Sequence, residues 1–418
     1  MGHISKQLAI YVCLLFCFIP YTMIATFYPK IAESKGIPYW LIGLVFSADP
    51  LAALFSSFFL SKYMIKIGRK KILLSGLFLS AFSMFILSPI EVVDKNLMLS
   101  LSFLSRIIAG MSAACVMVAG DSVFVSDYPD DVEKMVGRYE AVSGLGMIIG
   151  PLVGIVLYLE SLLIELIAFG GLILLTIPGI SLMLGNFRDY VVENHKMNYL
   201  ELFCKPKIML DLGVNISVMA CYGFLIPNLE IHLLNMGFSH WQMSLCFALL
   251  TFSYMVFSIY TNWLFQKLDA RSTIFIGFLL IALSFLMLSP WKVIFPTKLD
   301  IILASLPIMG LGQAMIYCKK YLVPIYPHMI QTSLEYGYSK DDVLVDSLSG
   351  LSNMALDAGE IIGPIISGGL ISLFGFENTG TLTAFTYAAY GLVYLFGSGL
   401  FSKWISNKKT VIPIIELE

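Results

Sequence analysis

The stretch Ser143–Gly154 reads SGLGMIIGPLVG and lies inside an apolar run long enough to cross a membrane. Each glycine inside a helix costs about 1 kcal/mol relative to alanine, and an interior proline costs about 3 kcal/mol. A second such stretch, Ala358–Gly369, reads AGEIIGPIISGG, and its Gly363-Pro364 follows Gly150-Pro151 by about half of the 418-residue chain. The return of an unfavourable element half a chain later predicts two structurally related halves.

The composition is that of a membrane protein. The chain is 58% hydrophobic and only 13% charged, whereas soluble domains carry about 25% charged residues. Its net charge of −2 favours neither a nucleic acid nor an acidic surface as a partner. The cysteines show no CxxC spacing and lie mostly in apolar runs, so we expect packing residues rather than disulfides or metal ligands. The first apolar run lacks a small-residue cleavage pattern, and we expect it to be retained as a span.

Twelve apolar stretches are long enough to span a bilayer, which takes about 20 residues. They lie at residues 7–29, 40–61, 72–90, 97–125, 136–159, 162–185, 208–231, 241–266, 272–291, 299–329, 343–374 and 378–402. We expect helices, because lipid offers no partner to an unsatisfied backbone group. The polar stretch between the sixth and seventh spans predicts an N-terminal six-helix bundle at residues 1–185, a cytosolic linker at 186–207, and a C-terminal six-helix bundle with a short cytosolic tail at 208–418.

The basic residues predict the orientation. Most lysines and arginines outside the spans fall in loops on the same side as the N-terminus. Since cytosolic loops carry the excess of positive charge, we expect both termini in the cytosol.

The glycines of the fifth span share one helix face. Gly146, Gly150 and Gly154 are spaced by four residues, and small residues let membrane helices approach closely. A simple helix-packing motif is one interpretation of this face. The recurrence of the element at Gly363 favours another, in which the fifth span packs against the other half, near the eighth span, and forms part of a gate.

Three stretches carry a resemblance to the major facilitator superfamily. The fifth-span stretch SGLGMIIGPLVG resembles the antiporter motif of that superfamily, and Arg106-Ile-Ile-Ala-Gly-Met-Ser-Ala-Ala resembles its proton-coupling motif. Lys66-Ile-Gly-Arg-Lys-Lys resembles its cytoplasmic gating loop. Residues 103–158 and 359–375 are similar to the vesicular amine transporters, most closely to the polyamine branch. The resemblance covers nearly the whole chain and implies a twelve-helix major facilitator fold with proton-coupled transport.

The gating loop departs from the family pattern. Ser61 and Ile65 stand where the family has glycine and aspartate. We therefore expect Arg69 to pair instead with Asp127, just past the cytosolic end of the fourth span.

The site also departs from the monoamine members of the family. Residues 13–25 hold no carboxylate where those members keep one, and Asp49 stands where they have lysine. These differences argue against a monoamine and leave a polyamine or another cation as substrate.

Charged residues within the spans give the site prediction, since a charge at the bilayer centre costs about 2.5–3.5 kcal/mol. We expect a midplane cavity lined by Asp49, Arg106 and at least one of Asp357 and Glu360. A permanent cation such as Arg106 would favour the ionised form of a neighbouring carboxylate, although bracing helix ends is an alternative role. We assign substrate and proton binding to Asp49, Arg106, Asp121, Asp357 and Glu360, and gating to Arg69, Asp127, Gly146, Gly150, Pro151, Gly154, Gly363 and Pro364.

Asp357 and Glu360 lie three residues apart and share a helix face. One of two close carboxylates can hold a proton near neutral pH, and the ionised pair can bind an ammonium group. A salt bridge to Lys319 or Lys320 is the structural alternative. Aromatic residues such as Tyr21 could line a cation path, although packing is their commoner role.

No metal-ligand spacing, phosphate loop or nucleophile elbow is present in the sequence. We expect no metal, no cofactor, no nucleic-acid partner and no enzyme activity. The leading hypothesis is a monomeric proton-coupled antiporter of an organic cation, a polyamine or related amine, in the membrane of a vesicle or another acidic organelle. The alternatives are an organic-anion carrier that uses Lys319, Lys320 and Arg106, and a transport-inactive facilitator fold that serves as a structural membrane subunit.

Overall fold

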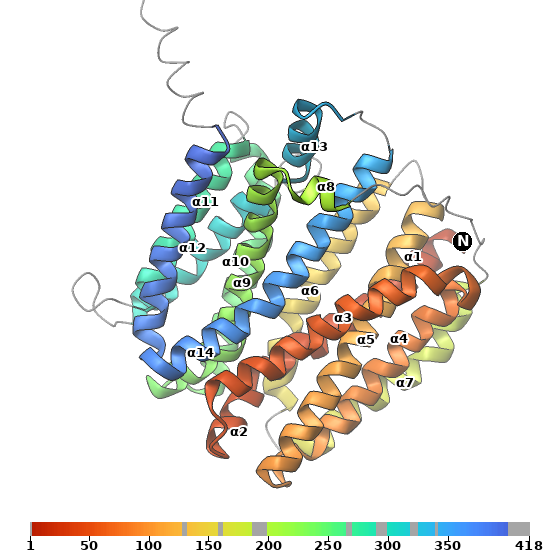
Figure 1. Ribbon diagram of the computed structural model, residues 1–418. Helices are drawn as coiled ribbons and strands as arrows, with labels where there is room; N and C mark the ends of the chain where they lie inside the picture. Colours follow the sequence, from red (N-terminus) through yellow and green to blue (C-terminus); the bar gives the residue numbers. More distant parts are fainter. Residues whose placement is uncertain are drawn as a thin grey trace, which may run out of the picture. The chain divides into compact units, whose positions relative to one another are not determined.

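The computed structural model describes residues 2–127, 132–157, 162–185, 199–264, 270–289, 299–317, 325–338 and 342–399. Within these ranges the regular structure is helical (Figure 1). The elements are α1 Gly2–Met23, η1 Ile24–Thr26, α2 Tyr28–Ser34, α3 Tyr39–Ile67, α4 Arg69–Leu87, η2 Ser88–Glu91, α5 Lys95–Asp127, α6 Val132–Leu157, α7 Leu162–Leu184, α8 Tyr199–Phe203, α9 Pro206–Asn235, α10 His240–Leu264, α11 Ala270–Leu288, α12 Leu299–Tyr317, α13 Ile325–Glu335 and α14 Asp342–Gly397.

The helices account for all twelve predicted spans. Eight described stretches are long and apolar enough to cross a membrane, and the one at residues 350–397 contains the last two predicted spans. Three shorter apolar helices, at residues 142–154, 245–258 and 300–316, match the fifth, eighth and tenth. The all-α fold class is confirmed. In the tenth predicted span the description of α12 reaches Tyr317, and residues 318–324, which include Lys319 and Lys320, lie outside the described part.

Gly375 separates the last two spans within α14. Its backbone has φ 77° and ψ 168°, a region that glycine alone occupies without strain because it has no Cβ. The chain therefore turns between the eleventh and twelfth spans without a longer loop.

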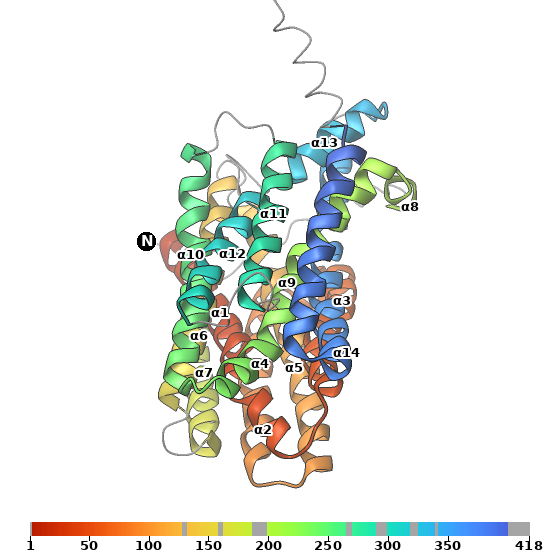
Figure 2. The ribbon, with the colours of Figure 1, turned by 90° about the vertical axis from the view of Figure 1, so that its left-hand side faces the viewer.

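Contacts group the chain into two compact units. The first unit holds Met1–Asn194, Met219–Phe252 and Leu356–Phe376, and the second holds His195–Val218, Ser253–Ala355 and Glu377–Glu418. In the first unit α3 lies along α5, and α4 contacts both α5 and α7 (Figures 1 and 2). In the second unit the main helix pair is α11 with α12. The predicted division at residues 186–207 stays a prediction.

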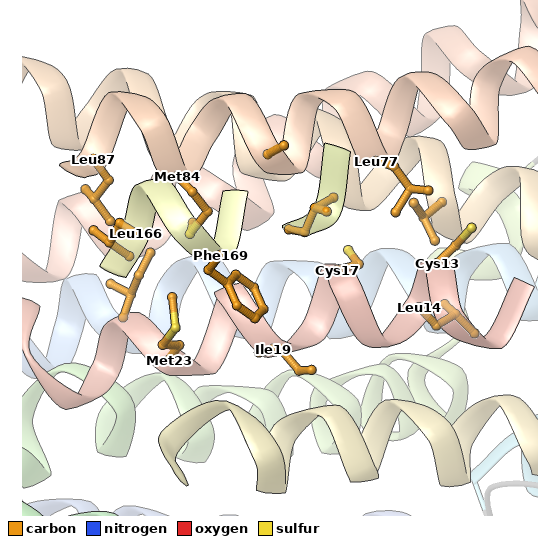
Figure 3. Packing of buried hydrophobic residues seen from close by; sticks show 14 of the residues in the cluster. Cys13, Leu14, Cys17, Ile19, Met23, Leu77, Met84, Leu87, Leu166 and Phe169 are labelled. Carbon is orange, nitrogen blue, oxygen red and sulfur yellow. The ribbon is translucent and has the colours of Figure 1, made fainter. Parts of the chain in front are cut away.

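The apolar core of the first unit lies where α1, α4 and α7 meet. Figure 3 shows Phe169 of α7 reaching between the other two helices, near Met84 of α4 and Met23 of α1. The Phe169 ring meets Phe16 edge to face at a centroid separation of 6.3 Å. Cys13 and Cys17 are buried in this layer as free thiols, which agrees with a packing role.

The glycine face of α6 packs on α1. A Cβ placed on Gly146 would lie 2.8 Å from the Cβ of Phe18, and one on Gly150 would collide with the Thr22 hydroxyl. These glycines therefore face the first span, and the expectation that the fifth span packs against the other half, near the eighth span, stays a prediction. The sequence specifies a face built for close approach, but it does not specify which helix fills that face.

The second glycine–proline element packs in the equivalent way. Gly363 lies against α9, where a Cβ would come 2.8 Å from the Ala220 carbonyl oxygen, and Pro364 contacts Gly223. The fifth span thus packs on the first, and the eleventh span packs on the seventh. The two pairs correspond under the predicted repeat of six spans.

Candidate functional site

The site begins with a buried ion pair between α3 and α5. Arg106 Nη2 lies 2.8 Å from Asp49 Oδ2, and both side chains are almost fully buried. Gly110, one turn after Arg106, creates this geometry, because the backbone of α3 at Asp49 occupies the space where a Cβ would stand. The spacing of arginine and glycine in the RIIAG stretch therefore has a direct structural purpose.

Two aromatic rings cover the guanidinium group. The Arg106 Cζ lies 5.6 Å from the ring centre of Tyr21 on α1 and 5.8 Å from that of Phe46 on α3. Both distances are within the range of cation–π attraction. Arg106 is thus held by one carboxylate and two rings, and its Nε and Nη1 have no hydrogen-bond partner in the described part of the chain.

A segment of α14 adds further carboxylates to this pair. The Ser47 hydroxyl donates a hydrogen bond to the Ile361 carbonyl oxygen at 2.7 Å. The Pro364 carbonyl oxygen occupies the space where a Cβ on Gly43 would stand. These contacts hold α14 against the first part of α3, around residues 39–47 (Figure 1). Glu360 consequently lies within hydrogen-bonding reach of the Tyr21 hydroxyl and interacts electrostatically with Asp49, Asp357 and Arg106.

We call Tyr21, Asp49, Arg106, Asp357 and Glu360 the charge cluster. It contains three carboxylates and one guanidinium. Asp49 is buried against Arg106, whereas Asp357 and Glu360 are half-buried. Once Asp49 and Arg106 have neutralised each other, the remaining two carboxylates can take up protons or a cation.

The other predicted site residues lie elsewhere or outside the description. The side chains of Asp121 and Asp127 on α5 lie outside the described residues, so the pairing of Arg69 with Asp127 stays a prediction. Arg69 itself is buried at the start of α4. Lys319 and Lys320 also lie outside, and a salt bridge from them to the α14 carboxylates stays untested.

Sequence reasoning missed the part that Gly110 plays, and it named Tyr21 only as one of the aromatic residues that could line a cation path. The signal for Gly110 was its position one turn after an intramembrane arginine. Tyr21 carried no comparable signal, because aromatic residues are common in this chain and its partners come from three other helices.

A group of polar contacts in the second unit was also not expected. Glu335 at the end of α13 pairs with Lys207 at 2.7 Å and with Arg271 at 3.7 Å. Tyr338 donates a 2.6 Å hydrogen bond to Glu201 on α8, and this bond raises the pKa of Tyr338 to about 12. These partly exposed contacts tie α8 and the start of α9 to the segment that precedes α14, and each is worth under about 1 kcal/mol.

The candidate site has no metal chemistry in the residues that the structure covers. No group of three or more histidine, cysteine, aspartate or glutamate side chains there is placed to hold a metal ion. Carboxylates such as those of the charge cluster can bind a proton or a cation.

Fold and site together define a class, that of many-helix membrane proteins with an internal repeat and a charged site among the helices. The chain belongs to the Major Facilitator Superfamily, whose family model matches residues 10–335. It is a multi-pass membrane transporter and not an enzyme.

Similar proteins agree with this family. The chain is 28% identical to the MFS-type transporter SLC18B1 of Rattus norvegicus over 389 residues, which cover 91% of this chain and 84% of the relative. It is 24% identical to the synaptic vesicular amine transporter of Bos taurus over 278 residues, which cover 65% of this chain and 51% of the relative. The resemblance to the vesicular amine transporters is thereby confirmed.

Solved structures share the fold. A D-xylose-proton symporter superposes with a TM-score of 0.73 at 13% identity and covers 95% of this chain and 97% of its own. The nucleoside transporter NupG superposes with a TM-score of 0.69 at 13% identity, with 94% and 98% covered. At this identity the agreement concerns the fold alone.

Proposed function

We propose that the protein exchanges protons for an organic cation, a polyamine or related amine, by alternating access. The observation that carries the proposal is the charge of the cluster, which holds three carboxylates and one guanidinium. When its carboxylates are ionised, a site with this excess of negative charge attracts cations and protons and repels anions. The excess of negative charge therefore weighs against the organic-anion alternative.

The ion pair gives the three carboxylates of the charge cluster different roles in this proposal. Arg106 and Asp49 hold each other, which leaves Asp357 and Glu360 as the groups that change ligand. An ammonium group 4 Å from one ionised carboxylate is attracted by about 4 kcal/mol at an effective dielectric constant of 20. Proton binding to the same carboxylate removes that attraction, so amine and proton compete for one site. Competition of this kind is the thermodynamic basis of antiport.

In this proposal the two halves related by the internal repeat are the parts that move. The seam of α6 on α1 and the seam of α14 on α9 are equivalent, as expected of two halves at residues 1–185 and 208–418 joined by the linker 186–207. We assign Gly146, Gly150, Pro151, Gly154, Gly363 and Pro364 to these seams, which would keep each half rigid while the halves rock about the cluster. Arg69 and Asp127 would stabilise one end state, and Asp121 would join the proton path.

The proposed antiport also suggests the orientation of the protein and the kind of membrane that holds it. Both termini would lie in the cytosol, and the membrane would be that of a vesicle or another acidic organelle, where a proton gradient can drive accumulation. The name of the bovine relative, a synaptic vesicular amine transporter, supports this setting. One chain holds every member of the cluster, so a monomer can serve as the transport unit, with the bilayer, the amine and protons as its partners.

Uptake into proteoliposomes tests the proposal. Purified protein in liposomes with an acidic interior should accumulate tritiated spermidine and not an organic anion such as glutamate. Nigericin, which collapses the pH gradient, should abolish the accumulation. Uptake of the anion in place of the amine would establish the carrier alternative, and uptake of neither under any gradient would favour the structural-subunit alternative.

A further inference from the structure

Tyr21 is the one residue of the charge cluster that touches both the arginine and a carboxylate that lies outside the ion pair. Its ring faces Arg106, with 5.6 Å from Cζ to the ring centre, and its hydroxyl is within hydrogen-bonding reach of Glu360. We propose that Tyr21 is a positioning residue that separates Glu360 from Arg106 and sets the pH at which Glu360 exchanges its proton for an amine. This inference rests on the proposed function and adds a residue to it.

Arg106 has more hydrogen-bond donors than its ion pair with Asp49 uses. A guanidinium has five N–H donors, and it binds carboxylates best through two parallel hydrogen bonds. Arg106 has its Nη2 beside Asp49, while Nε and Nη1 have no hydrogen-bond partner among the described residues. An arginine with unused donors beside a second carboxylate would be expected to bind it as well.

In this proposal Tyr21 prevents the second pairing, because it contacts both groups. Its ring covers the guanidinium on the α1 side, and Phe46 covers it from α3. The same tyrosine offers its hydroxyl to Glu360. Glu360 would then have a neutral donor as its partner in place of a cation, so that its ionised form could bind an incoming ammonium group.

The surroundings of Glu360 define what a test must control. The charged and titratable groups that face it are Tyr21 from α1, Asp49 from α3, Arg106 from α5 and Asp357 from its own helix. A donor to the ionised form favours ionisation, and a nearby cation favours it more strongly. Loss of the hydroxyl alone and loss of the whole ring should therefore act in opposite directions.

Two variants of Tyr21 separate these effects. Tyr21→Phe keeps the ring and removes the donor, so Glu360 should hold its proton to a pH about one unit higher. Tyr21→Leu removes the ring, so Arg106 can reach Glu360, which should then lose its proton at a pH at least one unit lower. Amine affinity of Tyr21→Leu should also fall at least tenfold, because the carboxylate is then neutralised by arginine.

The measurement is an infrared titration of purified protein without substrate. The protonated-carboxyl band of Glu360 is identified as the band lost in Glu360→Gln, and its midpoint is recorded for each variant. Tyr28→Phe is the matched control, since it removes another buried tyrosine hydroxyl and should leave the midpoint unchanged. The pH profile of spermidine uptake should move with the infrared midpoint.

The outcomes are separable from those of the proposed function. Opposite shifts in Tyr21→Phe and Tyr21→Leu support the positioning role. Shifts in the same direction, or no shift, overturn it even if wild-type protein accumulates spermidine. If the midpoints shift in opposite directions but wild-type protein neither binds nor transports the amine, the proposed function fails while Tyr21 still positions Glu360. A loss of thermal stability in Tyr21→Leu without a midpoint shift would mark a structural role only.

Discussion

The ion pair of Asp49 and Arg106 makes a prediction about stability that the charges alone determine. Asp49→Asn leaves a guanidinium that is almost fully buried, only 1% exposed, without its carboxylate. At a separation of 2.8 Å and an effective dielectric constant of 20, the lost attraction is about 6 kcal/mol. The net loss is smaller, since removal of one partner from a buried pair costs about 3–5 kcal/mol. We expect a decrease of that size in the free energy of unfolding.

Removal of the other partner should cost less. Arg106→Met leaves Asp49 without its cation, but a carboxylate can take up a proton and become neutral, whereas an arginine cannot lose its proton. The double variant Asp49→Asn with Arg106→Met carries no unpaired charge at this position. It should therefore be more stable than Asp49→Asn alone.

The assay is a double-mutant cycle on the purified protein. The free energy of unfolding is measured by SDS titration in mixed micelles at neutral pH, with the Tyr28→Phe variant as a control for a buried change nearby. A loss below about 1 kcal/mol in Asp49→Asn would contradict the reasoning. Equal losses in Asp49→Asn and Arg106→Met, with no recovery in the double variant, would also contradict it.

Three further predictions concern the seams, the last turn and the second unit. Gly150→Leu should cost about 1–3 kcal/mol by overpacking α1, whereas Gly144→Leu on the same helix, which faces open space, should be tolerated; equal costs would refute the seam. Gly375→Ala should cost about 1–3 kcal/mol because of its positive φ, and an unchanged melting curve would refute that strain. Glu201→Gln should lower the pKa of Tyr338 from about 12 toward its ordinary value of about 10, as followed by NMR of labelled tyrosine. The raised pKa of Tyr338 means that the folded state favours the protonated phenol. The stability that the hydrogen bond to Glu201 contributes is therefore present below about pH 10 and is lost as the pH rises toward 12. An unchanged Tyr338 titration in Glu201→Gln would contradict this.

The sequence was sufficient for the helices and insufficient for their partners. Spans could be predicted because lipid imposes a length of about 20 apolar residues on each. The face of Gly150 was also readable, since its spacing is local. Its partner was not, because any neighbouring helix with small or flexible residues can fill such a face.

The residues of the candidate site could likewise be predicted, but their arrangement could not. Asp49, Arg106 and Glu360 could be singled out because charges in spans are rare and costly. Their arrangement depends on two contacts that join distant parts of the chain, Gly110 with Asp49 and Ser47 with Ile361. Neither contact leaves a periodic signal, so the sequence could name the charges but not their arrangement around Tyr21.

The most direct test of the account is whether amine movement drives proton movement through Glu360. Protein is reconstituted into liposomes that contain the pH indicator pyranine and an acidic interior, and spermidine is added outside. We predict that the interior becomes more alkaline as amine enters, and that Glu360→Gln and Asp357→Asn abolish this proton efflux while the protein stays folded and still exchanges labelled amine. Amine entry without proton efflux in the wild-type protein, or normal proton efflux in both variants, would contradict the account.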